Sequence, residues 1–532
     1  MSRRSHRSVL VIGAGLAGCT TALRLAERGV PVTLLAASDA PDNANSWLAQ
    51  GGIIYQAAGG NDAASLAKDI TTAGHGVNLP EAVNFLAGEG PGAVRELLMD
   101  GIGVPFDRRE DWWPGANGEP WDLTREGGHS APRIVHCADH TGRSIMECLR
   151  QAVLRHPGIT CLQGYTAIDL LTSHHHCRGL VYRYQLEDEC CGAYVLNEAT
   201  KTVETMLADV TVLATGGVGQ VYLHSSNAST ATGAGIAMAS RAFVRLMNME
   251  FVQFHPTTLF HIEPRRFLIT EALRGEGAHL INAKGERFMQ KRDPRGELAP
   301  RDVVSSAIVD ELLETGEPCV FLDARTVKHD LESRFPTVLQ SCLERGVDIR
   351  TQPIPVVPAA HYFCGGILVD RAGRTSLSRL YAVGECTCTG LHGANRLAST
   401  SLLEALVWGK SAADDIAERV RAGLGPFTSL HEDIGDWRDQ GDEHNDDPAL
   451  IAQDWAAIRN TMWNYVGITR TSARLARAFE DLRDLSRHIH TFYASTPISR
   501  SIIELFHGCQ TAYLITQAAL RNKRDIGCHH RI

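Results

Sequence analysis

The sequence of 532 residues lacks several features that mark particular classes of protein. No apolar run approaches the roughly 18 residues of a membrane-spanning helix, so we expect no integral membrane protein. With 52 basic and 61 acidic residues the net charge is −9, and the chain lacks the basic excess on which nucleic-acid binding depends. Apolar residues make up 44% and charged residues 21%, which excludes a mainly disordered chain. We therefore expect a folded protein with no membrane and no nucleic-acid partner.

Cysteine patterns that would indicate a disulfide framework or a metal site are also missing. None of the fourteen cysteines forms a C-x-x-C pair. The closest groupings, Cys190 with Cys191 and Cys386 with Cys388, have no neighbours of the kind a zinc site needs. We expect reduced, mostly buried thiols and no bound metal. Only a short basic stretch precedes the first apolar run, too short for a transit peptide, so we expect a cytoplasmic protein.

Glycine is the residue in excess, at 49 of 532 positions, and its first cluster lies in an informative place. Residues 9–12 form an apolar run typical of a buried parallel strand. Residues 13–18 follow the pattern G-x-G-x-x-G, residues 19–28 are amphipathic, and residues 30–35 form a second apolar run. This order predicts a strand, a turn, a helix and a strand that together bind a dinucleotide.

The glycines of this turn have separate roles. Gly13 permits the tight turn, Gly15 lets a pyrophosphate reach the backbone, and Gly18 lets the helix pack on the strand. The free N–H groups at the start of the helix attract phosphate. An acidic residue usually ends the second strand and binds the ribose, but here residues 36–38 are Ala-Ala-Ser and Asp39 follows late. The sequence therefore leaves the ribose contact open.

Two later apolar runs also end in glycine, residues 210–214 before Gly216 and residues 380–383 before Gly384. Their separation suggests one sheet assembled from distant segments and interrupted by an inserted domain. Helical periodicity over residues 449–489, after a linker at residues 437–447, indicates a separate helical domain. We expect the following division: a dinucleotide-binding domain in two parts, residues 1–242 and 355–430, an inserted domain at residues 243–354, and a C-terminal helical domain at residues 431–532.

Further segments combine glycine with polar residues that a hydrophobic core would not accommodate. In chain order the motifs are GAGLAG (13–18), AQGG (49–52), REGGHS (125–130), QFHPT (253–257), TEALRGEGA (270–278), RGELAPRD (295–302), HYFCGG (361–366) and GLHGANRLAST (390–400). In these motifs the chain resembles the L-aspartate oxidases, within the succinate dehydrogenase/fumarate reductase flavoprotein family. The resemblance covers nearly the whole length and implies an α/β fold: a Rossmann-like FAD-binding domain interrupted by an α+β capping domain and followed by a C-terminal helical bundle.

The resemblance also implies noncovalent FAD. In the succinate dehydrogenase branch a histidine five residues before the AQGG glutamine carries the flavin, and Asn45 stands at that position here. Ala234 replaces an aspartate that contacts FAD in relatives, and Thr400 replaces a frequent asparagine. The positions expected to bind FAD are Gly13, Ala14, Gly15, Leu16, Ala17, Gly18, Ala36, Ser46, Trp47, Leu48, Ala49, Gln50, Gly51, Gly52, Ile53, Ala234, Glu385, Ser401 and Leu402.

The chemistry of aspartate sets requirements for a site that binds it. Two carboxylates need fixed cations, for which arginine is suited, and an ammonium group needs an acceptor. By resemblance, Arg396 and His361 bind one carboxylate. By the same resemblance His255 and Thr270 bind the other, with Glu271 beside them.

The resemblance assigns two further roles. Arg301 matches the family arginine that lies over the flavin and donates a proton in fumarate reduction. Glu126 matches the glutamate that L-aspartate oxidases place near the substrate amine, where it would favour an amino acid over succinate. We therefore expect Arg301, Glu126, His255 and Glu271 to be the catalytic residues.

The activity implied is FAD-dependent oxidation of L-aspartate to iminoaspartate by hydride transfer, with O2 or fumarate as electron acceptor. This is the first step of NAD biosynthesis, and quinolinate synthase uses the product. One alternative is a soluble fumarate reductase or succinate dehydrogenase flavoprotein subunit, against which Asn45 and Glu126 argue. A second is a noncatalytic flavin-binding scaffold, against which the set of Arg301, His255, His361 and Arg396 argues.

Overall fold

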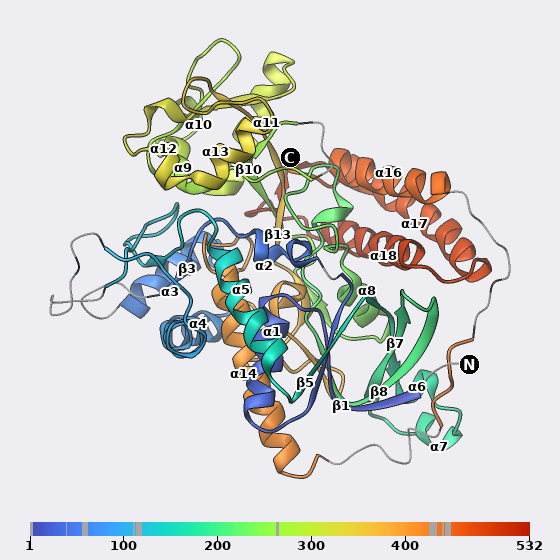
Figure 1. Ribbon diagram of the computed structural model, residues 1–532. Coiled ribbons are helices and arrows are strands. Elements are labelled where there is room, and N and C mark those ends of the chain that lie inside the picture. The colour runs from blue at the N-terminus through green and yellow to red at the C-terminus, as the bar shows by residue number, and fades with distance from the viewer. Residues whose placement is uncertain are drawn as a thin grey trace.

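The computed structural model of the chain describes residues 4–38, 40–55, 62–109, 112, 120–261, 265–424, 433–438, 441 and 448–532. Asp39 and residues 439–440 and 442–447 of the predicted linker lie outside the described residues, as does the predicted boundary between residues 430 and 431. Figure 1 shows a large body that contains the main sheet, a smaller lobe above it, and a group of long C-terminal helices at one side.

The main sheet is assembled from distant parts of the chain. Its strands are β1 (Arg4–Ile12), β2 (Val32–Ala36), β5 (Ile159–Gln163), β6 (Tyr165–Thr172), β7 (Cys190–Asn197), β8 (Thr202–Leu213) and β15 (Leu380–Ala382), in the order β5-β2-β1-β8-β7-β6 with β15 on β8. The pairings of β1 with β2 and β8, and of β8 with β15, are parallel. Because β15 pairs with β8, the segment between residues 213 and 380 interrupts this sheet, and an inserted lobe lies within it, as the sequence predicts.

Helices pack around this sheet and bury its apolar strands. They include α1 (Leu16–Glu27), α5 (Thr141–Arg155) and α14 (Ser401–Arg421). Close packing of α14 on α1 depends on Gly409, whose carbonyl accepts a hydrogen bond from Thr21 Oγ1 at 3.1 Å. Any Cβ at that position would lie 3.0 Å from the carbonyl oxygen of Ala17. The central strand residues Val9, Leu10 and Val11 are fully buried.

The smaller lobe has its own sheet and core. The sheet order is β10-β13-β12-β11, all antiparallel, formed by β10 (Val252–Leu259), β13 (Ile354–Phe363), β12 (Val320–Asp323) and β11 (His279–Ile281). It is accompanied by α9 (Glu271–Gly275), α11 (Arg301–Thr315) and α13 (Pro336–Leu343). A separate hydrophobic cluster that includes Leu280, Ile308 and Leu322 fills its interior. Strand β13 runs past the predicted boundary at residue 354 and so connects this lobe to the body.

The C-terminal part consists mainly of α16 (Pro448–Tyr465), α17 (Ser472–Ser495) and α18 (Arg500–Arg521). Thr471 and Ser499 begin α17 and α18 as N-caps, accepting hydrogen bonds from the amides of Arg474 and Ile502. Helix α18 packs against α8 (Ala234–Arg241), where Thr511 Oγ1 donates to the carbonyl of Gly233 at 3.1 Å. The last strand, β18 (His530–Arg531), pairs with β17 (Thr469–Arg470).

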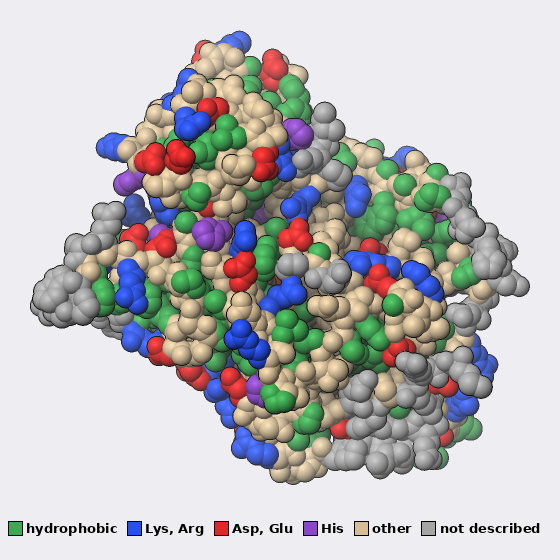
Figure 2. All heavy atoms as spheres, viewed as in Figure 1, with side chains coloured by type: hydrophobic (Ala, Val, Ile, Leu, Met, Phe, Trp, Pro, Cys, Tyr) green, Lys and Arg blue, Asp and Glu red, His purple; other side chains and the backbone are tan. Residues whose placement is uncertain are grey.

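Surface character agrees with the composition. On the face in Figure 2, basic and acidic side chains are interspersed over both the upper lobe and the body. Of the helices in the described ranges, none combines the length and the apolar character that crossing a membrane would require. All fourteen cysteines are free thiols, and twelve of them are buried.

Candidate active site

One cavity joins the glycine-rich turn to the polar residues of the smaller lobe. Its walls include Gly13 and Gly15 from the turn and Gln50 from the AQGG motif. The same walls include seven of the residues assigned to substrate binding or catalysis: Glu126, His255, Thr270, Glu271, Arg301, His361 and Arg396. Sequence positions almost 400 residues apart therefore line a common space at the junction of the lobe and the body.

The turn has the geometry that a dinucleotide pyrophosphate requires. Gly13 has φ +115°, a conformation that side chains rarely adopt, and a Cβ there would overlap the carbonyl of Ala214. A Cβ at Gly18 would overlap the carbonyl of Gly13, so only glycine allows α1 to begin so close to β1. Gly15, the N-cap of α1, supplies no side-chain cap, which leaves N–H groups at this helix end to bind phosphate.

The residues around the AQGG motif also fit a flavin. Gln50 is buried and lines the cavity, yet among the described residues its Oε1 has no hydrogen-bond partner. Asn45 Nδ2 donates to Glu385 Oε2 at 2.9 Å, and Glu385 Oε1 accepts from the amide of Phe363 at 3.1 Å. Burial raises the pKa of Glu385 to about 7. An acceptor without a partner, on Gln50, and an ionisable group with a raised pKa, Glu385, are features of a buried cleft that binds a cofactor.

All but three of the positions expected to bind FAD line this cavity. Gly18 is occupied instead with packing α1 against the turn. Trp47 faces Arg143, whose guanidinium lies 5.8 Å from its ring. Ile53 belongs to the two-residue strand β3 (Ile53–Ile54), opposite Val135. These three residues support the walls of the cavity, whereas Ala234, Glu385, Ser401 and Leu402 line it as expected.

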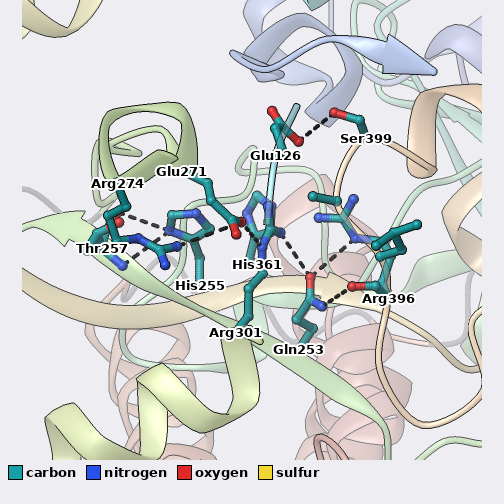
Figure 3. A network of polar contacts seen from close by, with 12 residues as sticks. Glu126, Gln253, His255, Thr257, Glu271, Arg274, Arg301, His361, Arg396 and Ser399 are labelled. Atoms are coloured by element: carbon teal, nitrogen blue, oxygen red, sulfur yellow. Dashed lines mark hydrogen bonds and ion pairs between the residues drawn. The ribbon is translucent and has the colours of Figure 1, made fainter. Parts of the chain in front are cut away.

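Arg301 lies at the centre of the polar cluster drawn in Figure 3. It is the first residue of α11, and its Nε donates to Glu271 Oε2 at 2.6 Å. Arg274 approaches the same oxygen at 3.7 Å. Burial alone would raise the pKa of Glu271, but the charges of Arg301 and Arg274 outweigh it and leave that pKa lowered. Glu271 is therefore a buried carboxylate held between two guanidinium groups.

Gln253 is a residue of this cluster to which the sequence analysis assigned no role. Its Oε1 accepts hydrogen bonds from Arg301 Nη1 at 3.0 Å and from Arg396 Nε at 3.2 Å. Its Nε2 donates to Asn395 Oδ1 at 2.6 Å, which fixes the orientation of the amide. Alternation along β10 could have identified it, because residues two apart on a strand face the same side and Gln253 is two residues before His255.

Two buried histidines lie beside the arginines. The rings of His255 and His361 are 5.1 Å apart between centroids. Burial, and then the charge of Arg301, lower the pKa of both well below the ordinary histidine value. Ser226 Oγ lies 2.9 Å from His361 Nδ1. Both rings are therefore neutral near pH 7 and can hydrogen-bond a substrate carboxylate without adding charge.

Thr270 lines the cavity as the N-cap of α9, where its hydroxyl accepts a hydrogen bond from the amide of Ala272 at 3.3 Å. Arg396 stacks its guanidinium 4.6 Å from the centre of the Tyr362 ring. Burial, and then the charge of Arg301, lower the pKa of Arg396 to about 10. Tyr362 is fixed in turn by Glu404, which accepts its hydroxyl hydrogen at 2.7 Å.

Glu126 contributes a carboxylate from the opposite side of the cavity. Ser399 Oγ donates to Glu126 Oε2 at 2.7 Å (Figure 3). Ser399 reaches this position with φ +57°, a strained conformation for a non-glycine residue. Burial, and then the negative charge of Glu271, raise the pKa of Glu126. Two arginines thus lie on one side of the cavity and a carboxylate lies on the other. These charges complement the two carboxylates and the ammonium group of an amino dicarboxylic acid.

Comparison with known proteins gives the family and the fold. The family described as FAD binding domain matches residues 8–402. The chain is 43% identical to an L-aspartate oxidase of Pseudomonas aeruginosa, over 100% of this chain and 96% of that protein. It is also 43% identical to an L-aspartate oxidase of Yersinia pestis, over 98% and 95% of the two chains. A solved quinol fumarate reductase of E. coli superposes with a TM-score of 0.85 at 28% identity, over 100% of this chain and 92% of that chain.

These similarities confirm the predicted fold class, a divided FAD-binding domain with a capping domain and helical C-terminal domain, and they confirm FAD as the cofactor. Identity of this level over the whole chain leaves little room for a different family. The chain belongs to the L-aspartate oxidase family.

Proposed function

We propose that this protein oxidises L-aspartate to iminoaspartate with FAD as the oxidant and with O2 or fumarate as the final electron acceptor. The observation that carries the proposal is the shared cavity, in which a dinucleotide turn meets Arg301 and Arg396 on one side and Glu126 on the other. A succinate-oxidising enzyme would have no use for a buried carboxylate aimed at its dianionic substrate, because that carboxylate would repel it.

Each group of the substrate has a counterpart in the site. We assign one carboxylate to Arg396 and His361, and the other to His255 and Thr270, with Arg301 close to the reacting carbon. The guanidinium groups of Arg301 and Arg396 are held in place by Gln253, so little reorganisation is needed when substrate binds. Glu126 accepts a hydrogen bond from the substrate ammonium group through Oε1, since Ser399 already occupies Oε2.

Proton transfer follows from the same geometry. The substrate ammonium must lose a proton before hydride leaves Cα, and the raised pKa of Glu126 makes this carboxylate a better base than an ordinary glutamate. When bound, FAD supplies the acceptor of the hydride from Cα. When fumarate is reduced, Arg301 donates the proton and recovers it through Glu271, whose Oε2 lies 2.6 Å from Arg301 Nε.

Several finer assignments belong to this proposal. FAD is held noncovalently, because Asn45 has no ring nitrogen to bond to a flavin and its amide is bound to Glu385. The small-molecule partners are L-aspartate and either O2 or fumarate, and the imine passes to quinolinate synthase as the first step of NAD biosynthesis. We place the reaction in the cytoplasm, where the free thiols would stay reduced.

An anaerobic flavin titration tests the proposal. The bound flavin should lose its absorbance band on addition of L-aspartate, but not of D-aspartate or succinate, and fumarate should restore it. Bleaching by succinate and not by L-aspartate would favour the fumarate reductase alternative. Bleaching by none of these compounds would favour a noncatalytic flavin-binding scaffold.

A further inference from the structure

The first βαβ unit supplies no carboxylate to the ribose of a dinucleotide among its described residues. In such folds an acidic side chain at the end of the second strand binds the ribose hydroxyls. Here β2 ends at Ala36, and Ala37 and Ser38 follow. Within the part of the chain that the structure describes, a carboxylate for the ribose therefore has to be sought elsewhere on the cavity wall.

The cavity continues past the end of β2 to the C-terminal helical domain. Beyond the glycine turn, away from Arg301, its lining includes Ala37 and Ser38, Gln163 at the end of the neighbouring strand β5, and Glu504 and His507 of α18. The glycine turn would hold the pyrophosphate and the residues near Arg301 would hold the ring that reacts, so this opposite arm is where the adenosine half of FAD would fit.

Glu504 is anchored at the end of β2 by a chain of contacts. Arg500 Nη1 donates to the carbonyl of Ala37 at 2.7 Å, and Arg500 Nε donates to Glu504 Oε1 at 2.8 Å. The second oxygen, Oε2, accepts no hydrogen bond from any part of the chain that the structure describes. The side chain of Glu504 is 25% exposed, and burial raises its pKa. Glu504 Oε1 is thus fixed by Arg500, while Oε2 can accept a hydrogen bond from a ligand in the cavity.

His507 lies one helical turn further along α18, on the same face. It is 1% exposed and lines the cavity, and its Nδ1 is without a hydrogen-bond partner within the described ranges. Its Nε2 is already engaged, 3.0 Å from the carbonyl of Ile168 and 3.1 Å from Arg241 Nη2. A buried polar atom without a partner is costly, so His507 is a second and independent sign of a missing ligand.

We propose that α18 completes the FAD site, with Glu504 Oε2 accepting hydrogen bonds from the hydroxyl groups of the adenosine ribose and His507 closing the same arm of the cavity. The C-terminal helical domain is then part of the cofactor site. This assignment relies on FAD as the cofactor and is independent of which substrate is oxidised.

The test compares two ligands on the same protein. Dissociation constants of FAD, and of an FAD analogue whose adenosine ribose lacks its 2′ and 3′ hydroxyls, are measured by equilibrium dialysis with the full chain freed of flavin. The unaltered protein should bind FAD roughly 10- to 100-fold more tightly than the analogue, because one hydrogen bond to a charged group changes affinity by about this factor. Glu504→Ala should weaken the binding of FAD by a similar factor and leave the dissociation constant of the analogue almost unchanged.

Two further variants make the comparison decisive. Glu504→Gln keeps the shape of the side chain and should also reduce the preference for FAD over the analogue. Glu480→Ala removes an exposed glutamate of α17 and should leave both constants unchanged. Equal weakening of FAD and the analogue by Glu504→Ala would assign Glu504 to folding alone and overturn the proposal. A preference for FAD over the analogue that survives in both Glu504→Ala and Glu504→Gln would also overturn the proposal.

Discussion

Arg301 and Arg396 meet at a single atom, the Oε1 of Gln253, to which they donate hydrogen bonds of 3.0 and 3.2 Å. One arginine begins a helix of the capping lobe and the other lies in the loop before α14. Like charges this close repel each other, and the shared acceptor offsets part of that repulsion. The two guanidinium groups are thereby held apart at a fixed spacing before any substrate arrives.

Replacing Gln253 by leucine should therefore disturb both arginines together. We expect kcat/KM for L-aspartate to fall by roughly 10- to 100-fold, since a hydrogen bond to a charged group contributes about 1.5–3 kcal/mol. Gln290→Leu, at an exposed position of the capping lobe, is the matched control and should leave kcat/KM unchanged. Unaltered steady-state kinetics in Gln253→Leu would show that the bridge has no role in the reaction.

Arg301→Leu should abolish turnover while the protein still binds FAD. The guanidinium contacts Glu271 and Gln253, and its loss should lower kcat by at least roughly 100-fold, the cost of removing one preorganised charge. Flavin absorbance of the purified variant reports the bound FAD, and oxygen consumption reports turnover. Arg295→Leu, at an exposed residue of the segment before α11, serves as the control. Aspartate oxidation that persists in Arg301→Leu would remove Arg301 from the mechanism.

Glu126→Gln should impair aspartate oxidation more than fumarate reduction, because fumarate has no amine for the carboxylate to bind. A difference of roughly tenfold between the two losses is expected for one charge-assisted hydrogen bond. The pKa of Glu126 is raised, so its carboxylate is protonated at a higher pH than an ordinary glutamate, and the KM for L-aspartate should rise as pH falls through that pKa. If the Glu126→Gln variant lost both activities equally, the amine-binding role would be discarded.

The contact between His75 and Asp302 should make the stability of the folded protein depend on pH. His75 Nε2 lies 3.1 Å from Asp302 Oδ2, on the residue after Arg301, and the hydrogen bond to Asp302 raises the pKa of His75. A raised pKa in the folded state contributes stability below the unfolded pKa of about 6.5, and this contribution is lost as pH rises through the folded value.

Comparison of melting temperatures tests this dependence. The difference in Tm between the unaltered protein and His75→Gln should be largest near pH 6 and should shrink as pH rises above the folded pKa. His329→Gln, at an exposed histidine of the capping lobe, is the control. A difference that grows with rising pH would contradict the assignment of the ion pair.

Local sequence was sufficient for the elements whose geometry depends on neighbouring residues. The strand, glycine turn and helix at residues 9–28 could be predicted because local geometry requires the glycines: Gly13 has φ +115°, and a Cβ at Gly18 would overlap the carbonyl of Gly13. The resemblance to a family extended the prediction to four site residues, and the structure brings all of them to one cavity: Arg301, His255, His361 and Arg396. The assigned roles of these residues stay predictions until variants are measured.

Other features depended on segments that meet only in the folded chain. Gln253 became part of the site because Arg301 at the start of α11 and Arg396 in the loop before α14 both donate to its Oε1. Alternation along β10 places Gln253 on the same side as His255, but it does not record that meeting. Glu504 reaches the end of β2 across more than 450 residues, through Arg500 and the carbonyl of Ala37. The sequence by itself determined the dinucleotide turn and the types of residue in the site. Only the tertiary structure decided which of them share a cavity, because long-range packing, unlike a turn, leaves no periodic trace in the sequence.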